Sequence, residues 1–234
     1  MSAVAVIGAG YAGLTTAACF ASMGHQVTCG DVDEGLISSL REGVVPGVEP
    51  GLADLVRSGL EQGRLAFVVG PAAAVAGCEF AYLCLPTPEG PDGSPDLSDI
   101  RSAANEIRLL LRSESIVVVK ATVPVGTTRV VEQILRRDDV RVASNPEFQR
   151  EGSAVHDFLH PDRIIIGSDD TAAAFRVASL FDQLRAPLLL TDPTSAETIN
   201  MPRTRSWRPR CRSSTPSPTS VTSLAPTCAT SSWA

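Results

Sequence analysis

The stretch Ala3-Val-Ala-Val-Ile-Gly-Ala-Gly-Tyr-Ala-Gly13 decides the fold of this chain. It joins an apolar run, typical of a buried strand, to three closely spaced glycines, and a helix-compatible stretch follows from Leu14 to Met23. Glycines with this spacing, between a strand and a helix, match the turn that binds the pyrophosphate of a dinucleotide. Gly8 would permit the tight turn, Gly10 would let the phosphates approach the backbone, and Gly13 would let the helix pack closely on the strand.

This turn and the strand after it predict NAD as the cofactor. The phosphates would lie at the helix N-terminus, where free amides and the helix dipole favour negative charge, so Tyr11 and Ala12 are also expected to contact the cofactor. Asp31 ends the next predicted strand, where its carboxylate can accept hydrogen bonds from the adenosine ribose and would repel the 2′-phosphate of NADP. The alternative is that the glycines only close a turn and that Asp31 caps a helix.

Apolar runs alternate with amphipathic stretches over the rest of the first 200 residues. We expect strands at Gln26–Asp31, Leu65–Val69, Glu79–Leu85, Ser115–Lys120, Val140–Ala143, Arg163–Gly167 and Pro187–Leu190. We expect helices at Asp33–Arg41, Leu52–Gln62, Ser98–Arg112, Thr127–Arg137 and Ala172–Leu184, and a loop around residues 145–162. Because parallel neighbours need helical crossovers, this alternation predicts a doubly wound, mostly parallel, Rossmann-like α/β sheet.

The composition changes abruptly at Asn200. Residues 201–234 contain no Asp, Glu or Lys but five Arg and both Trp of the chain, and the rest is mostly Ser, Thr and Pro. Such a segment cannot bury enough apolar surface to offset its ordering entropy. We therefore expect an NAD-binding domain at residues 1–200 and a disordered tail at residues 201–234.

Charge and hydropathy exclude several classes of function. The formal net charge of −6 includes the basic tail, so the body is more acidic still, which argues against nucleic-acid binding. No run approaches the roughly 18 apolar residues needed to span a bilayer, and no basic segment of a secretory signal precedes the first apolar run. We expect a cytoplasmic protein without a membrane partner. The cysteines show no metal-ligand spacing, so we expect no metal site and regard the four in the body as small core residues.

Five further motifs narrow the interpretation, and three of them follow predicted strands. They are Glu49-Pro-Gly-Leu52, Cys84-Leu-Pro-Thr-Pro88 with Asp92-Gly-Ser-Pro-Asp-Leu-Ser98, Lys120-Ala-Thr-Val-Pro-Val-Gly-Thr127, Asn145-Pro-Glu-Phe-Gln-Arg-Glu-Gly152 and His160-Pro-Asp-Arg163. Strand ends of this kind border the ligand crevice of an open parallel sheet. With these motifs, residues 1–200 resemble the UDP-glucose 6-dehydrogenases. GDP-mannose and UDP-N-acetylmannosamine dehydrogenases are the alternatives within the same superfamily.

The resemblance implies a reaction and a set of site residues. That family oxidises the primary alcohol of a sugar, UDP-glucose in this case, to a carboxylate with two NAD, through an aldehyde and a cysteine-bound thiohemiacetal and thioester. Thr87 and Thr122 would contact the nicotinamide side of NAD, and Thr122 is the candidate catalytic hydroxyl. Glu147 matches the general base of thioester hydrolysis, and Glu151 matches an acid close to cofactor and substrate. Four residues apart, these glutamates could share a helical face and raise each other's pKa. The alternatives are a strand-end cap for Thr122 and a solvated acidic turn for the glutamates.

The sequence after Ile199 departs from the family pattern. Relatives continue with a long helix that begins with a catalytic lysine, followed by a UDP-sugar domain whose nucleophilic cysteine lies in a glycine-rich loop. Here Asn200-Met-Pro-Arg203 follows, and neither Cys211 nor Cys228 has a glycine nearby. We expect a fragment truncated before the nucleophile, inactive as written and without the family's dimer interface. A stand-alone NAD-binding module or regulator is the alternative.

A shifted reading frame would explain the tail. If Asn200-Met-Pro-Arg203 is encoded AAT ATG CCG CGA, restoring one G after the first two bases gives AAG TAT GCC GCG, which reads Lys-Tyr-Ala-Ala as the family demands. Permitted codons extend this frame into an amphipathic helix over the whole tail. Sequencing the gene tests the hypothesis, and an uninterrupted tail frame in independent isolates would contradict it.

Overall fold

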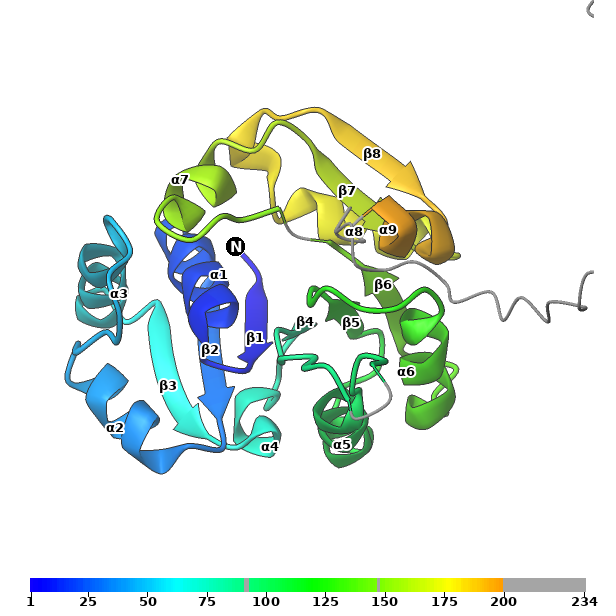
Figure 1. Cartoon of the computed structure of the whole chain (residues 1–234), viewed down its shortest axis with the longest axis horizontal. Coiled ribbons are helices and arrows are strands. Elements are labelled where there is room, and N and C mark those ends of the chain that lie inside the picture. The colour runs from blue at the N-terminus through cyan, green and yellow to red at the C-terminus, as the bar shows by residue number, and fades with distance from the viewer. Residues whose placement is uncertain (91–92, 147, 200–234) are drawn as a thin grey trace, which may run out of the picture. The chain divides into compact units, whose positions relative to one another are not determined.

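A computed structural model describes residues 1–90, 93–146 and 148–199, and the tail that we expect to be disordered, residues 201–234, lies outside them. Within the described residues, eight strands form one sheet flanked by helices (Figure 1). The strands are β1 (Ala3–Ile7), β2 (Gln26–Asp31), β3 (Leu65–Val69), β4 (Phe80–Leu83), β5 (Ile116–Val119), β6 (Arg141–Ser144), β7 (Ile164–Gly167) and β8 (Leu188–Thr191). The helices are α1 (Tyr11–Ser22), α2 (Glu34–Arg41), α3 (Leu52–Glu61), α4 (Pro71–Ala74), α5 (Ser98–Ile107), α6 (Thr127–Leu135), α7 (Ala154–Leu159), α8 (Thr171–Ser179) and α9 (Pro193–Ile199), with a 3-10 turn at Asp182–Leu184.

The strand order is β3-β2-β1-β4-β5-β6-β7-β8. Neighbouring strands are parallel except β6 and β7, which pair antiparallel at Ser144 and Gly167. The order reverses between β1 and β4, and an open α/β sheet binds its ligand in the crevice at the carboxyl ends of the strands at such a point. The doubly wound, mostly parallel sheet predicted from the sequence is confirmed.

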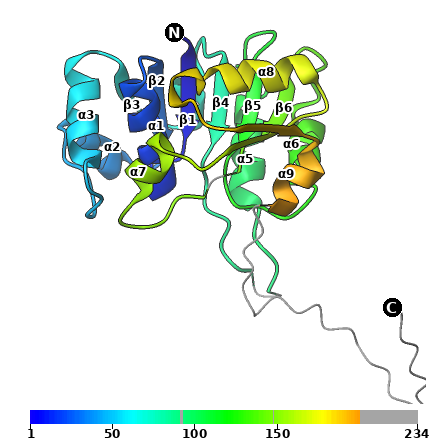
Figure 2. The same ribbon diagram turned by 90° about the horizontal axis from the view of Figure 1, so that it is seen from above.

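Helices cover both faces of this sheet (Figure 2). Along β1, Val4 and Val6 enter one apolar core while Ala5 and Ile7 enter the other, as the two-residue period of a strand requires. The first core contains apolar residues of α1, α3, α7 and α8, and the second contains those of α4, α5 and α6. Because both faces are covered, the central strands are continuous apolar runs, and the sequence locates them for this reason.

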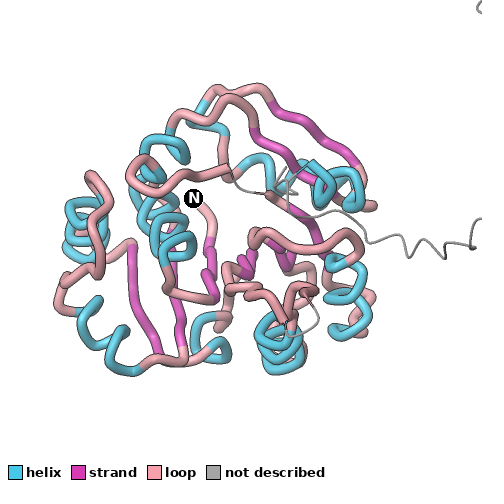
Figure 3. The backbone as a smooth tube through the Cα atoms, in the orientation of Figure 1, coloured by secondary structure: helices cyan, strands magenta, loops and turns pink. Residues whose placement is uncertain are grey.

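Short helices account for most differences from the expected elements (Figure 3). α7 lies within residues 145–162, which we expected to form a loop, while α4 and α9 lie in stretches to which no element was assigned. The helix expected at Ala172–Leu184 ends at Ser179 and is followed by the 3-10 turn. α4, α7 and α9 have four, six and seven residues, too few to display a helical period.

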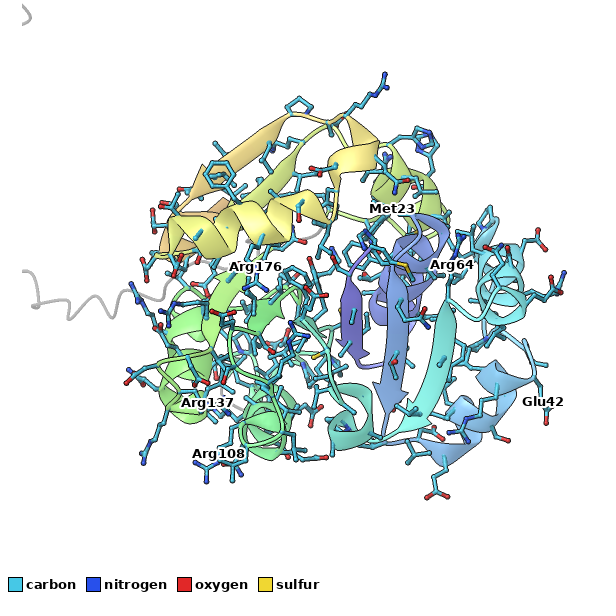
Figure 4. The ribbon with its side chains drawn as sticks, turned by 180° about the vertical axis from the view of Figure 1, so that it is seen from behind. Met23, Glu42, Arg64, Arg108, Arg137 and Arg176 are labelled. Carbon is cyan, nitrogen blue, oxygen red and sulfur yellow. The ribbon has the colours of Figure 1, made fainter. Side chains whose placement is uncertain are left out.

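Arginine side chains fix the connections at the amino edge of the sheet, opposite the candidate site (Figure 4). Arg137, just after α6, pairs with Asp139 at 2.6 Å and donates to the carbonyl of Arg108 at 3.0 Å, which ties α6 to α5. Arg176 of α8 donates to the carbonyl of Glu114 at 2.7 Å. Arg137 thus holds the end of α6 beside the end of α5, and Arg176 holds α8 beside the segment that precedes β5.

Candidate functional site

The glycine-rich turn between β1 and α1 has the geometry expected from its sequence. Gly8 has a φ of 99°, and a Cβ there would lie 2.7 Å from the carbonyl oxygen of Cys84. A Cβ on Gly13 would lie 1.9 Å from the carbonyl oxygen of Gly8. A Cβ on Gly10 would meet nothing within 4 Å. Gly8 and Gly13 are therefore required by packing inside the protein, whereas Gly10 borders space that the described residues leave open.

The N-terminus of α1 is suited to an anion. The helix begins at Tyr11 directly after Gly10, no side chain caps it, and its first turn contains no acidic residue. The first amides of a helix have no partner within the helix, and its dipole favours negative charge at this end. Tyr11 and Ala12 therefore lie where the pyrophosphate of a dinucleotide would bind.

Asp31 is fixed beside this turn by backbone amides. Its Oδ2 accepts a hydrogen bond from the amide of Ala9 at 2.7 Å, and its Oδ1 accepts one from Asp33 at 3.1 Å. Helix α2 is capped by Asp33, whose Oδ1 accepts from the amide of Leu36 at 3.0 Å. The alternative that Asp31 is the helix cap is therefore wrong. A carboxylate has about four acceptor positions, so Asp31 can also bind the hydroxyls of a ribose.

Thr87 and Thr122 lie together at the carboxyl ends of β4 and β5. The Thr87 hydroxyl donates to the carbonyl oxygen of Thr122 at 2.8 Å. The two strands are neighbours in the sheet, so the loops that follow them meet at the crevice. The structure thus brings the two threonines together, while their roles toward a cofactor stay predictions.

Glu151 lies in an exposed turn before α7 and not on a helix. Gly152 follows it with a φ of 85°, and α7 begins only at Ala154. The expectation that Glu147 and Glu151 share a helical face is therefore wrong, because residues 148–150 between them are not helical. Glu147 itself lies outside the described residues. The catalytic roles of both glutamates remain predictions.

Glu49 is a buried residue of the site to which the sequence pattern assigned no role. Its Oε2 accepts hydrogen bonds from the Tyr11 hydroxyl and from the amide of Gly152 at 2.9 Å, and its Oε1 accepts from the amide of Val155 at 3.3 Å. Burial by itself would raise the pKa of Glu49, but these hydrogen bonds outweigh it and lower the pKa. Burial, and then the contact with Glu49, raises the pKa of Tyr11. Only the motif Glu49-Pro-Gly-Leu52 marked this residue, and nothing in that motif predicts burial.

A cavity of about 440 Å³ lies beyond the carboxyl ends of β5 and β6. The residues that line it include Lys120, Asn145, Gln149 and Phe158. The residues of the glycine-rich turn are not among those that line it. Lys120 is buried, and its Nζ lies 5.4 Å from the centre of the Phe158 ring. Among the residues that the structure describes, the Oδ1 of Asn145 and both polar atoms of the Gln149 side chain are buried and have no hydrogen-bond partner. The cavity is therefore partly polar inside.

The cysteines of the described residues belong to the core, as expected. Cys19, Cys29, Cys78 and Cys84 are all buried. Burial raises the pKa of the Cys19 thiol to about 12 and that of Cys78 to about 11, and it raises the pKa of Cys29 well above its ordinary value. The thiolate is the nucleophilic form of cysteine. These three residues are therefore poor nucleophiles at neutral pH.

Two features are missing from the part of the chain that the structure describes. It contains no group of three or more His, Cys, Asp or Glu side chains arranged to hold a metal ion. None of its helices combines the length and the apolar character that crossing a bilayer requires.

Known proteins share both the sequence and the fold. UDP-glucose 6-dehydrogenase of Pseudomonas aeruginosa is 48% identical over 192 residues, which are 79% of this chain and 42% of that protein. The structure of a UDP-glucose dehydrogenase from the hyperthermophilic archaeon Pyrobaculum islandicum matches with a TM-score of 0.82 and 39% identity, and covers 85% of this chain and 48% of that one. A ternary complex of GDP-mannose dehydrogenase from Pseudomonas aeruginosa matches with a TM-score of 0.80 and 31% identity, over 86% of this chain and 48% of that one.

The chain spans about half the length of the curated relatives it matches. Residues 2–185 match the NAD-binding domain of one family over nearly all of the described sheet. Sequence, fold and the geometry of the glycine-rich turn thus agree, and the chain belongs to the UDP-glucose/GDP-mannose dehydrogenase family, of which it carries the NAD-binding domain.

Proposed function

We propose that this chain is the NAD-binding half of a UDP-glucose 6-dehydrogenase, and that by itself it binds NAD without oxidising the sugar. The observation that carries the proposal is the open space over Gly10 at the uncapped N-terminus of α1, beside the fixed carboxylate of Asp31. Gly8, Tyr11, Ala12 and Gly13 complete the turn. Bound NAD would accept a hydride from the alcohol carbon of the sugar.

Other residues of this chain would act on the nicotinamide side. Thr87, through its bond to the Thr122 carbonyl, would fix the loop after β5 beside the reacting carbon. Thr122 would supply a hydroxyl to that carbon's oxygen, Glu151 would lie near cofactor and substrate, and Glu147 would act as the general base of thioester hydrolysis. A general base works when it lies within hydrogen-bond reach of the proton that it removes.

UDP-glucose is the substrate that the relatives support best. The two proteins described above that are named for UDP-glucose are 48% and 39% identical to this chain, compared with 31% for the GDP-mannose enzyme. We therefore place the parental enzyme among the UDP-glucose 6-dehydrogenases rather than among the GDP-mannose or UDP-N-acetylmannosamine dehydrogenases.

The proposed lack of turnover by residues 1–234 follows from the surroundings of their cysteines. A thioester intermediate needs a reactive thiolate, and removing a covalent nucleophile abolishes the overall reaction. In the described residues the cysteines are buried. Cys211 and Cys228 have Arg, Pro, Ser, Thr and Ala as neighbours and no glycine-rich loop.

A calorimetric titration with NAD and NADP, beside a UDP-glucose turnover assay, tests the proposal. We expect NAD to bind at least about fivefold more tightly than NADP, because a carboxylate near a 2′-phosphate costs roughly 1–4 kcal/mol in repulsion. Asp31→Asn should reduce this preference for NAD over NADP, since Asn keeps an acceptor for the Ala9 amide but carries no charge. Asp33→Asn is the matched control, because it changes the neighbouring acid that caps α2 and should keep most of the preference.

Two results would contradict the proposal. One is the absence of NAD binding at millimolar concentration, and the other is unaided conversion of UDP-glucose to its uronic acid by the purified chain. Stable accumulation in the cell together with NAD binding would favour a stand-alone module or regulator instead.

A further inference from the structure

We propose that Glu49 is a positioning residue of the cofactor site, whose carboxylate holds the glycine-rich turn at a fixed distance from the turn at residues 150–155. The inference rests on the proposed binding of NAD at the glycine-rich turn. It assigns no chemical step to Glu49, which acts through the groups that it binds.

Three segments far apart in the sequence meet at this carboxylate. Tyr11 is the first residue of α1, and Glu49 lies in the irregular segment between α2 and α3. Gly152 lies in the turn before α7, and Val155 lies in the first turn of that helix. Glu49 is only 9% exposed. A carboxylate accepts about four hydrogen bonds, so three donors from two directions define one orientation of it.

Tyr11 is what connects this cluster to the cofactor site. Its side chain follows Gly10 directly, and the residue is 40% exposed. Besides donating to Glu49, its hydroxyl accepts a hydrogen bond from the amide of Gly152 at 3.1 Å and lies 3.4 Å from the carbonyl oxygen of Arg150. The Tyr11 ring therefore bridges the glycine-rich turn and the turn that carries Glu151.

If Glu49 served only to cap α7, its contact with Tyr11 would be unexplained. α7 is already held against α1, since the rings of Phe158 and Phe20 meet edge to face at 5.3 Å between centroids. The 150–157 segment is closed by its own ion pair, in which Arg150 Nη2 lies 2.8 Å from Asp157 Oδ1. What Glu49 adds is the polar connection to Tyr11 and thus to the site.

The consequence is a preorganised cofactor site. Without the carboxylate, the Tyr11 ring could turn over the space next to Gly10, and the 150–155 turn could move away from it. NAD would then have to order both groups on binding, and ordering of this kind lowers affinity.

The test is NAD affinity, measured by calorimetry on folded variants of the full chain. We expect Glu49→Ala to weaken NAD binding on the order of tenfold, and Glu49→Gln to recover part of the loss because its amide oxygen can still accept one of the bonds. Tyr11→Phe should also weaken binding. Glu79→Gln is the matched control: Glu79 also accepts from a backbone amide, that of Ala3 at 3.3 Å, but at the amino end of β1. Its affinity should stay at the wild-type value.

Hydrogen exchange of the Gly152 and Val155 amides separates positioning from capping. In Tyr11→Phe these amides should stay protected by Glu49 while NAD affinity falls, and in Glu49→Ala both protection and affinity should fall. If wild type binds NAD and both variants bind within twofold of it, the inference is overturned and Glu49 is only a cap. If Glu49→Ala does not fold, Tyr11→Phe decides in the same way. Failure of wild type to bind NAD would instead overturn the proposed function on which the inference rests.

Discussion

Gly10 and Gly13 occupy the same turn but differ in what an added methyl group would meet. On Gly13 the methyl carbon would lie 1.9 Å from the Gly8 carbonyl oxygen, so the backbone itself would have to move. Gly10 has a φ of −64° and open space above it, so alanine fits there without strain. Packing inside the domain thus excludes a larger residue at Gly13, whereas only a bound ligand would exclude a larger residue at Gly10.

We predict that Gly13→Ala destabilises the fold by about 3 kcal/mol, at the upper end of overpacking costs. Gly10→Ala should leave stability unchanged or raise it by up to about 1 kcal/mol, because alanine restricts the unfolded chain. Only Gly10→Ala should weaken NAD binding in a fully folded protein. Urea unfolding and calorimetry measure the two effects. Equal NAD affinity in Gly10→Ala and wild type would show that the phosphates do not approach this position.

Burial favours the neutral form of His25, and this makes stability depend on pH. Its Nε2 lies 3.0 Å from the Leu180 carbonyl, which can only accept, and its Nδ1 accepts from the Ser2 amide at 3.3 Å. Burial lowers the pKa of His25 below 6.5, more than the Leu180 bond raises it. The unfolded chain therefore binds more protons between the folded pKa and the unfolded value near 6.5.

It follows that the contribution of His25 to the free energy of unfolding is complete above about pH 6.5. This contribution declines as the pH falls toward the pKa of His25 in the folded chain. The decline is about 1.4 kcal/mol for each pH unit between the folded and the unfolded pKa. His25→Gln should remove this part of the slope. Urea unfolding of both proteins between pH 5 and 8 measures it, and identical slopes would show that His25 titrates alike in the folded and unfolded chain.

The structural role of a single residue can be predicted from sequence when its neighbours along the chain alone determine what that position requires. The turn at Gly8, the close packing at Gly13 and the position of Asp31 at the end of β2 could be predicted, because the spacing of the glycines and the end of an apolar run are local features. Glu49 could not, since its burial depends on Tyr11 and Gly152, which lie 38 and 103 residues away along the chain. A glutamate next to Pro and Gly looks like any solvated loop residue.

Among the elements, the buried strands were the most predictable. β5 and β7 are fully buried runs of Ile and Val, with a closing Gly in β7, and such runs between turn residues predict strands directly. α7 was missed because its buried positions, Ala154, Val155 and Phe158, fill a single turn and a half beside two histidines. The antiparallel direction of β7 was missed as well, because the residues of a strand do not encode which way it runs.

The last described helix is firmly attached to the sheet although the sequence assigned no element there. Glu197 of α9 is 2% exposed, and its carboxylate accepts hydrogen bonds from the amides of Gly126 at 2.6 Å and Thr128 at 2.7 Å. These amides lie at the start of α6, where the helix dipole stabilises the negative charge of the Glu197 carboxylate. Ala196 packs under Gly167, where a Cβ would lie 2.5 Å from it. α9 is therefore already docked where the unusual tail begins.

Across the whole molecule, the described residues bury both faces of the sheet but leave apolar side chains exposed near their end. Leu188 and Leu189 on the edge strand β8 are each 44% exposed, and Ile199 at the end of α9 is 38% exposed. An edge strand with exposed leucines is a site for association with other chains. In the frame that the family pattern requires, α9 would continue as a long amphipathic helix whose apolar face could cover such a surface.

We therefore predict that the purified chain associates into particles of mixed size, whereas a variant with residues 200–234 replaced by the frame-restored helix forms one discrete species. Sedimentation velocity over a range of concentrations measures this, and circular dichroism should show more helix in the restored variant. A chain ending at Ile199 is the control: if the exposed apolar surface causes association, this chain should also associate, and if the basic tail causes it, this chain should not. A monodisperse, heat-stable monomer of the unaltered sequence would contradict the prediction, because the exposed apolar side chains of β8 and α9 would then need no cover.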